Sequence, residues 1–228
     1  MATTSSATPL DSIASAHTES RKQATSGVRS SWEFFPALTA AKVPHGFSLR
    51  TGGIDHPPPI RDLGIDPDRL IGAEQPHGNE IAFVENASRR FYPGVDGLLT
   101  QCPGVALKIR IADCAAVYLF DPEIPALGLV HSGRRGSEAG IVTKAIEGFR
   151  NRWGSPAERL MIQISPCIRP PHYEVDFARQ IREQALDMGV RSLFDCETCT
   201  ACHLDRYFSY RAEKGKTGRM WAVAMLPV

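Results

Sequence analysis

One stretch of this 228-residue chain constrains the fold more than any other, the segment IRIADCAAVYLFDPEIPALGLVHSGRRG at residues 109 to 136. Two short runs rich in β-branched and aromatic residues lie on either side of a turn that contains Asp121, Pro122 and Pro125. Such runs favour β-strands, whereas proline and aspartate favour turns. The segment therefore predicts an antiparallel hairpin.

The register of this hairpin brings two chemically active side chains together. If the loop runs from residue 121 to residue 125, residue 120 faces residue 126 and residue 115 faces residue 131. Cys114 and His131 then meet at the open end, where opposed side chains have Cβ atoms about 5 Å apart. A thiolate and an imidazole at that separation reach one zinc ion at about 2.3 and 2.0 Å. The hairpin therefore permits a shared metal.

A third ligand has to come from outside the hairpin. His77, in QPHGNEIAFVE, stands beside a glycine just before another strand-like run. Three protein ligands leave a coordination position for water or substrate, which distinguishes a catalytic zinc from a closed structural one. We therefore predict a catalytic zinc bound by His77, Cys114 and His131. The alternative is a non-catalytic module in which zinc only staples the fold, with His45 or His172 as a fourth ligand.

The rest of the chain contains more strand-like than helix-like segments. Apolar positions recur at helical spacing in residues 141 to 153 and 177 to 188, the second of which ends before Gly189. Because strands and helices do not strictly alternate, an α+β fold of sheets covered by helices is favoured over a doubly wound parallel sheet. Strands are expected at Ile81–Val84, Gly97–Thr100, Val105–Ile111, Ala115–Phe120, Ala126–Val130, Leu160–Ile164, Tyr207–Tyr210 and Met220–Leu226.

The N-terminal segment differs in composition from the rest. Residues 1 to about 30 are rich in Ser, Thr and Ala and show no sustained apolar period, so they have too little apolar surface to fold alone. We expect a disordered extension there. The texture changes at Trp32, and residues 31–228 are expected to form one domain with a sizeable core, since 43% of the chain is hydrophobic.

Charge and hydropathy argue against several classes of partner. The chain has 26 Lys and Arg against 25 Asp and Glu, so its formal net charge of +1 gives no basic tract for nucleic acid. No run approaches the roughly 20 apolar residues of a membrane helix, and the N-terminus lacks the apolar segment of a secretory signal. A cytoplasmic location is therefore expected. In that compartment the six cysteines are expected to bind metal or to be buried.

Six sequence words in a fixed order carry a resemblance to a known family: QPHG, DGLLT, IADC, HSGRRG, SPCIRPPHYEVD and YFSYRAEKGKTGRM. They resemble the laccase-domain family, also called multicopper polyphenol oxidase-like proteins, over about His45 to Met225. The resemblance implies a layered α/β/β/α fold with mixed sheets. It also implies zinc ligands at the histidine of QPHG, the cysteine of IADC and the histidine of HSGRRG, which are His77, Cys114 and His131.

The same resemblance implies an enzyme. Family members are associated with phosphorolysis of adenosine, inosine, guanosine and methylthioadenosine, so purine nucleosides and phosphate are the expected partners. Adenosine deamination is a second associated activity, in which a zinc-activated hydroxide would attack the purine C6. An older association is copper-dependent oxidation of phenols. Blue-copper oxidases require clusters of histidines, which the seven scattered histidines of this chain do not form.

Two residues depart from the family pattern. Arg134 stands where the family usually has Trp, and Ser132 stands where it usually has Ala. We expect a more polar pocket wall beside His131 and, with it, a different substrate preference.

Three arginines are candidate contacts for phosphate or ribose. Arg50, followed by Thr-Gly-Gly, resembles the family's FSTRxGG word, and Arg135 and Arg211 belong to the shared words HSGRRG and YFSYR. A structural role is open for each of them. For Arg135 we favour a guanidinium that pins the loop under His131.

Two acidic residues near the expected ligands are open to more than one role. Asp113 either orients an imidazole by accepting its second N–H or caps the local turn. Glu80 is close to His77 in sequence but is expected on the following strand, so the general acid stays unassigned.

The segment CETCTACH, residues 196 to 203, has the CxxCxxC spacing of a metal site and ends on His203. Iron–sulfur and structural zinc sites need a fourth ligand or a partner motif, and no separate CxxC occurs. The family commonly has a Cys-Thr pair here, which Cys199 and Thr200 match. We therefore interpret the segment as a loop, with a second metal at Cys196, Cys199 and Cys202 as the alternative.

Overall fold

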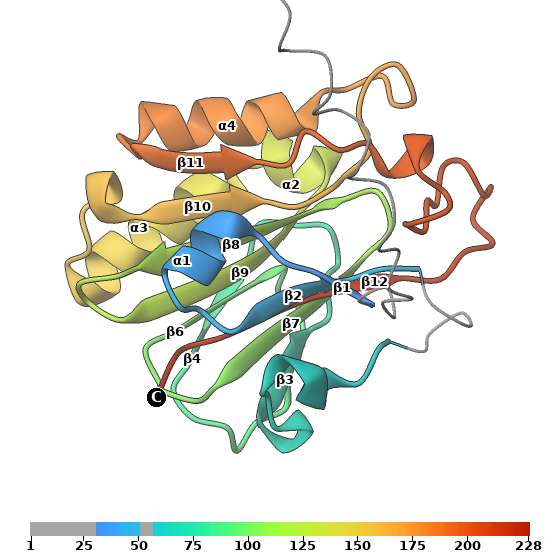
Figure 1. The fold of residues 1–228 in the computed structure, drawn as a ribbon. Helices are drawn as coiled ribbons and strands as arrows, with labels where there is room; N and C mark the ends of the chain where they lie inside the picture. The colour runs from blue at the N-terminus through green and yellow to red at the C-terminus, as the bar shows by residue number, and fades with distance from the viewer. Residues whose placement is uncertain (1–30, 51–56) are drawn as a thin grey trace, which may run out of the picture. The chain divides into compact units, whose positions relative to one another are not determined.

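The computed structural model describes residues 31–50 and 57–228, and the expected disordered extension at residues 1–30 lies outside the described residues. Two mixed six-stranded sheets dominate the described part (Figure 1). In the order of pairing, the first consists of β1 (Trp32–Glu33), β2 (His45–Ser48), β12 (Met220–Met225), β7 (Ala106–Ile111), β3 (Leu70–Ala73) and β5 (Phe91–Tyr92). The second consists of β11 (Ser192–Asp195), β10 (Met161–Ile164), β8 (Ala115–Asp121), β9 (Ala126–Ser132), β6 (Gly97–Thr100) and β4 (Ile81–Val84).

Helices cover the outer face of the second sheet. The described α-helices are α1 (Pro36–Ala40), α2 (Arg134–Glu138), α3 (Ile141–Trp153) and α4 (Phe177–Asp187). Three of them, α2, α3 and α4, pack on this sheet, yellow to orange in Figure 1. Short 3₁₀ turns complete the described structure, at η1 (Ile60–Leu63), η2 (Pro67–Arg69), η3 (Ala157–Arg159) and η4 (Thr200–Cys202). None of the helices in the described ranges is long and apolar enough to span a membrane.

Three apolar clusters define the layers. The first lies between the sheets and contains Leu107 of β7 and Tyr118 of β8. The second lies between the second sheet and its helices, where Phe149 of α3 is fully buried. The third covers the outer face of the first sheet, where the η1 segment supplies Ile60 and Leu63. The predicted α+β class with mixed sheets and covering helices is confirmed. In the described residues, the outer face of the first sheet is covered by a 3₁₀ turn and not by an α-helix.

The two predicted helices form because each has one apolar stripe. The buried residues of α3 and α4 recur at three- and four-residue intervals, as a helix that covers a sheet requires. Asp176 caps α4 by accepting the N–H of Arg179, and α3 ends at Gly154, whose φ of 70° suits glycine. Both helices lie within two residues of their expected bounds.

The central hairpin is present, but its predicted register is wrong by one residue. Asp121 pairs with Ala126, and Ala116 pairs with His131. The carboxylate of Asp121 accepts two backbone N–H groups of the loop that follows, which keeps this residue in the strand. The loop is therefore four residues long instead of five. Every residue of β8 and β9 is buried, because the first sheet and the helices cover opposite faces of the hairpin.

The predicted strand Tyr207–Tyr210 is wrong. Tyr207 and Phe208 are buried in the inter-sheet cluster, but the backbone N–H of Tyr207 bonds to the carbonyl of His203 in a turn. Aromatic residues that fill a core from a loop imitate a strand in sequence. Five described strands were not predicted. Of these, β2 and β3 contain glycine, β11 is only half-buried, and β1 and β5 are two residues long.

Gly128 in β9 gives a test of the packing between the second sheet and α3. A Cβ at this position would lie 2.6 Å from Cδ2 of Leu99 and 3.0 Å from Cε2 of Phe149. We expect Gly128→Ala to lower the free energy of unfolding by about 1 to 3 kcal/mol, because neither buried side chain has room to move. Urea unfolding measures the change. Gly72→Ala is the matched control, since its Cβ would meet only the flexible end of Lys108, and an equal loss there would contradict this account.

Candidate metal centre

Three elements bring His77, Cys114 and His131 together. His77 lies in the loop between β3 and β4, Cys114 ends the turn between β7 and β8, and His131 belongs to β9. One donor atom from each of the three lies within 4.8 Å of the others. The rings of the two histidines are 4.8 Å apart and nearly perpendicular, at 83°. We call these three residues the trio.

The corrected register explains why Cys114 and His131 meet. Because Ala116 pairs with His131, Cys114 is two residues beyond the position opposite His131, on the same face of the hairpin. The two side chains are therefore diagonal neighbours, a spacing across which long side chains still touch. In the predicted register they would have pointed to opposite faces, since a shift of one residue reverses the direction of every side chain.

Gly133 leaves the room that the thiol of Cys114 occupies. A Cβ on Gly133 would lie only 2.5 Å from the sulfur. The glycine that follows Ser132 in the HSGRRG word therefore serves close approach and not an unusual backbone angle, since its φ is −105°.

Asp96, directly before β6, holds both histidines of the trio. Its carboxylate is fully buried and accepts hydrogen bonds from Nδ1 of His131 at 2.8 Å, the backbone N–H of His77 at 2.9 Å and that of Gly78 at 2.7 Å. His77 is itself in the left-handed region, with a φ of 66°, so its loop needs such an anchor. With Nδ1 of His131 engaged, Nε2 is free to face a metal, as in carboxylate–histidine–zinc arrangements.

The electrostatics of the trio favour an ionised thiol. Burial raises the pKa of the Cys114 thiol, but hydrogen bonds to His131 and His77 outweigh it and bring the pKa down to about 6. Burial lowers the pKa of His131, but Asp96 and Cys114 more than compensate and raise it to about 9. A thiolate is the form of cysteine that binds metals. A binding metal would displace the protons that remain on the imidazole nitrogens facing it.

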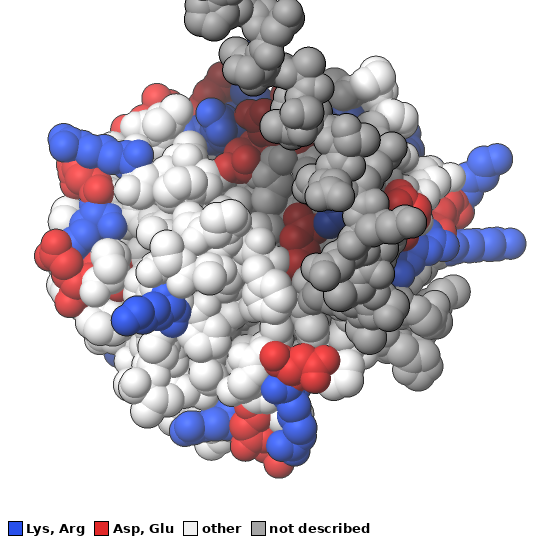
Figure 2. Space-filling view, viewed as in Figure 1, with Lys and Arg blue, Asp and Glu red and all other residues white. Residues whose placement is uncertain are grey.

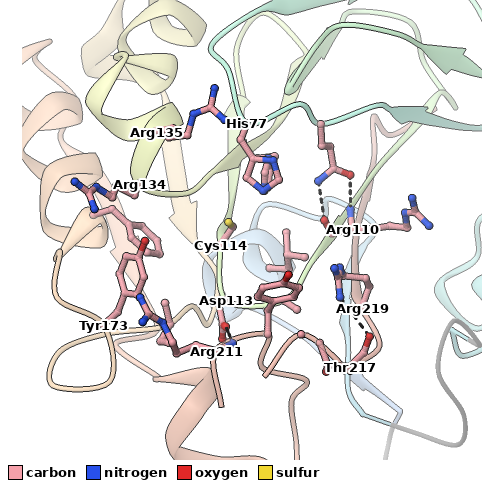
Figure 3. Close-up of a pocket in the computed structure, with 18 of the residues that line it drawn as sticks. His77, Arg110, Asp113, Cys114, Arg134, Arg135, Tyr173, Arg211, Thr217 and Arg219 are labelled. Atoms are coloured by element: carbon pink, nitrogen blue, oxygen red, sulfur yellow. Dashed lines mark hydrogen bonds between the residues drawn. The ribbon is translucent and has the colours of Figure 1, made fainter. Parts of the chain in front are cut away.

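The trio lies in an open cleft with a volume of about 1320 Å³, larger than the ~300 to 1,000 Å³ usual for small-molecule sites. We call it the cleft. Its lining residues, many of them basic, are Glu74, Gln75, His77, Arg110, Ile111, Ala112, Asp113, Cys114, His131, Arg134, Arg135, Glu138, Ile168, Tyr173, Phe177, Tyr210, Arg211, Lys214, Gly215, Thr217 and Arg219. Charges of the two signs are interspersed on the face of the molecule drawn in Figure 2, whereas arginines gather in the cleft (Figure 3).

The cleft arginines differ in how they are neutralised. Arg134 pairs with Glu138 at 2.9 Å, and Arg211 pairs with Glu174 at 2.9 Å. Arg110 and Arg135 are exposed, and neither side chain has a hydrogen bond or an ion pair with any described residue. Arg219 pairs with no described carboxylate either, although it donates to the carbonyls of Thr217 and Gly218. Uncompensated guanidinium groups in one concave site favour an anionic ligand.

The structure separates the predicted contact residues. Arg135 and Arg211 line the cleft, whereas Arg50 does not and pairs instead with Glu213 at 2.8 Å. The pinning role favoured for Arg135 stays a prediction, and no hydrogen bond or ion pair from its guanidinium to a described loop residue supports it. Ser132 faces Ser137 in the interior, so of the two departures from the family pattern only Arg134 makes the cleft wall more polar.

The acidic residues also differ from expectation. Asp113 does not orient an imidazole; its carboxylate accepts the hydroxyl of Thr200 and the backbone N–H of Arg211, both at 2.7 Å. Asp96 orients the imidazole instead. Glu80 is not among the residues that line the cleft and pairs with Lys144 at 2.7 Å.

The fourth ligands considered for a zinc staple do not join the trio. Both ring nitrogens of His45 are occupied, by the N–H of Phe35 and the carbonyl of Val43, and His172 belongs to another cluster. Within the described ranges the trio is therefore a three-ligand site. One thiolate and two imidazoles are donors that zinc accepts in proteins, so the residues fit the implied metal.

Sequence analysis missed two residues of this site. Asp96 begins the DGLLT word. An aspartate that belongs to a family word and directly precedes a buried strand could have indicated a carboxylate that orients a ligand. Arg110 gave no signal, because an arginine in an alternating strand is normally solvated. Its place in the lining of the cleft comes from the pairing of β7 with β12 and from the turn that joins β7 to β8.

Comparison with known proteins identifies the family. Residues 59–179 and 175–227 match the family described as multi-copper polyphenol oxidoreductase laccase. The chain belongs to this family. Among similar proteins, the purine nucleoside phosphorylase of Deinococcus radiodurans is 30% identical, over 81% of this chain and 90% of its own length.

A second relative links sequence and fold. The purine nucleoside phosphorylase YlmD of Geobacillus stearothermophilus is 30% identical over 70% of this chain and 73% of its own length. The crystal structure of YlmD from that organism matches with a TM-score of 0.81 at 24% identity, covering 88% of this chain and 97% of the YlmD chain. The family fold is therefore present over most of this chain.

Proposed function

We propose that this family member is a metal-dependent purine nucleoside phosphorylase, with zinc bound by His77, Cys114 and His131. The observation that carries the proposal is a three-donor trio in a cleft that also presents two unpaired guanidinium groups. The names of the two relatives supply the reaction class.

Two imidazoles and one thiolate bind either zinc or copper, and the rest of the site favours zinc. Zinc takes cysteine and histidine together and, with three protein ligands, keeps one position open. A blue-copper site adds a weak axial ligand, usually methionine, and no methionine is among the described residues that line the cleft. When bound, zinc would supply Lewis-acid polarisation of an oxygen or a water.

Arg110 and Arg135 are the proposed phosphate contacts. Guanidinium groups bind phosphate oxygens through paired, charge-assisted hydrogen bonds, and these two have no competing carboxylate in the described structure. In the view of Figure 3 they lie on either side of His77. Phosphate bound by either guanidinium would lie in the cleft that contains the trio.

Aromatic side chains provide a surface for the purine. Tyr210 lines the cleft and is 54% exposed, so its ring is accessible to a base. Tyr173 lines the same cleft, with the guanidinium of Arg211 4.8 Å from its ring centre. A purine stacked on such a ring gains about 1 to 3 kcal/mol. The cleft is large enough to hold nucleoside and phosphate together.

In the proposed reaction a phosphate oxygen forms a bond to C1′ of the ribose, and the bond from C1′ to the purine nitrogen breaks. The electron pair leaves with the purine, which takes up a proton, and ribose 1-phosphate is the second product. The protein contributes orientation and charge: the arginines hold the nucleophile beside the sugar, and the aromatic rings fix the base.

Product analysis tests the proposal. The zinc-loaded chain is incubated with adenosine, inosine or methylthioadenosine, with and without phosphate, and the products are separated. The expected result is free base together with ribose 1-phosphate, or 5-methylthioribose 1-phosphate from methylthioadenosine, formed only with phosphate. Inosine and ammonia formed from adenosine without phosphate would indicate a deaminase instead, and oxygen uptake with a phenol would indicate an oxidase.

Substitution of the unpaired arginines is expected to weaken phosphate binding. Arg110→Ala and Arg135→Ala should each raise KM for phosphate about tenfold, because a hydrogen bond to a charged group contributes about 1.5 to 3 kcal/mol. KM for the nucleoside should change much less. Arg152→Ala, which removes an exposed arginine paired with Glu85, is the matched control. Equal changes in both KM values would show that the arginines do not select phosphate.

A further inference from the structure

A second set of metal-binding side chains lies outside the trio. One donor atom each from His172, Cys199 and Cys202 lies within 4.8 Å of the others. Nδ1 of His172 is 3.9 Å from the sulfur of Cys199 and 3.4 Å from that of Cys202. We call these residues the second cluster.

Two chain segments far apart in sequence build the second cluster. Cys199 and Cys202 lie at either end of η4, whose single 3₁₀ turn points both thiols the same way. An isolated parallel bridge joins Cys199 to Cys167, with backbone hydrogen bonds of 3.1 Å on both sides. Cys167 precedes the loop that carries His172, so the bridge aligns the two segments.

The motif in the sequence is not the site in the structure. The sulfur of Cys196 donates to the carbonyl of Ile164 at 3.2 Å, and burial raises the pKa of this thiol to about 12. His203 joins no group of metal-binding residues in the described structure. The third donor beside Cys199 and Cys202 is instead His172, which lies 27 residues before Cys199. The interpretation of this segment as a loop of incidental thiols overlooked that partner.

The distances suit one tetrahedral ion. With zinc bonds of about 2.3 Å to sulfur and 2.0 Å to nitrogen, tetrahedral angles put sulfur and nitrogen about 3.5 Å apart. The two measured distances lie on either side of that value. Cys199 is buried and fixed, whereas Cys202 and His172 are exposed, so an ion has access from solvent. The donor set, two thiolates and one imidazole, is soft and favours zinc over magnesium or calcium.

We propose that His172, Cys199 and Cys202 form a second zinc site, separate from the trio and independent of the reaction assigned to the cleft. The ion would tie η4 to the loop that follows β10. This region supports the cleft, because Thr200 in η4 donates its hydroxyl to Asp113 at 2.7 Å, and Asp113 precedes Cys114. The ion would therefore stabilise the segment that supports the cleft, and its fourth coordination position would be open to water.

Metal counting on a background without the first site tests the proposal. Cys114→Ser removes a ligand of the trio, and the purified full chain is kept reduced, saturated with zinc and freed of loose metal. We expect about one zinc per chain in this variant. Adding Cys202→Ser or His172→Ala should reduce that to near zero, whereas the matched controls Cys196→Ser and His203→Ala should keep it. Unchanged zinc after Cys202→Ser or His172→Ala would overturn the proposal.

Thermal unfolding gives a readout that needs no activity. Zinc should raise the melting temperature of Cys114→Ser, because a ligand that binds only the folded state stabilises it, and should not raise that of Cys114→Ser with Cys202→Ser. In the chain that retains Cys114, Cys202→Ser should lower bound zinc by one ion per chain. This comparison tests the second site even if Cys114→Ser folds poorly. A Cys199–Cys202 disulfide in the freshly purified chain, detected by mass, together with no second zinc after reduction, would also overturn the proposal.

Discussion

Replacement of Cys114 by alanine is expected to abolish measurable purine turnover and to reduce bound zinc by one ion per chain. Cys114 supplies the thiolate of the trio, and only His77 and His131 remain when it is removed. A zinc ion contributes several kcal/mol of charge stabilisation in a transition state. Its loss should therefore slow turnover by at least about 10³-fold, since each 1.36 kcal/mol is a factor of ten.

Zinc and turnover have to be measured on the same preparation. Cys102→Ala is the matched control, because this thiol is also partly buried but donates to the carbonyl of Glu85 and belongs to no metal-binding group in the described ranges. It should keep both zinc and activity. Loss of activity with all zinc retained would contradict the ligand role and would indicate a nucleophilic cysteine instead.

The hairpin shows what sequence reasoning predicted and what it missed. Alternative loop lengths at Asp121 differ by one residue, and sequence alone does not reveal that its carboxylate caps the loop from within the strand. That one residue decides whether Cys114 and His131 share a face. Their proximity was expected, but the geometry that produces it was not.

Residues that converge across the fold were predicted less well than neighbours in sequence. Asp96 and His172 each complete a cluster from a segment with no local periodicity or spacing that points to the partner. Short motifs predicted the rest, because QPHG, IADC and HSGRRG each carry one donor of the trio. Of the three cysteines in the CxxCxxC spacing, Cys199 and Cys202 belong to a group of possible metal ligands, whereas Cys196 does not.

Asp96→Asn is expected to lower zinc affinity at the trio, or turnover, by about 10- to 100-fold, the usual effect of losing a carboxylate that orients a histidine ligand. The Asp96 carboxylate accepts three N–H groups, two at Oδ1 and one at Oδ2. An asparagine has one carbonyl oxygen, which can replace only one of these two oxygens. Its NH₂ group takes the other position, where it faces an N–H donor and cannot accept a hydrogen bond. Either Gly78 loses its acceptor, or His131 and His77 do.

The second arrangement is the damaging one for the metal. An asparagine NH₂ directed at Nδ1 of His131 would favour the tautomer with hydrogen on Nε2, the nitrogen that the metal requires. In either arrangement a buried donor is left unpaired, which should cost about 1 to 3 kcal/mol of folding stability. Loss of metal affinity must therefore be distinguished from general destabilisation.

Asp121→Asn makes that distinction. Asp121 is equally buried, also accepts several donors, and pairs with Arg159 at 2.7 Å at the opposite end of the hairpin. It should lose folding stability, measured by urea unfolding, but keep its zinc affinity, measured by competition with a chelator. Asp96→Asn should lose both. If both variants lose stability and neither loses zinc affinity, Asp96 supports the fold alone, and the orientation of His131 must come from the packing of β9 between the two sheets.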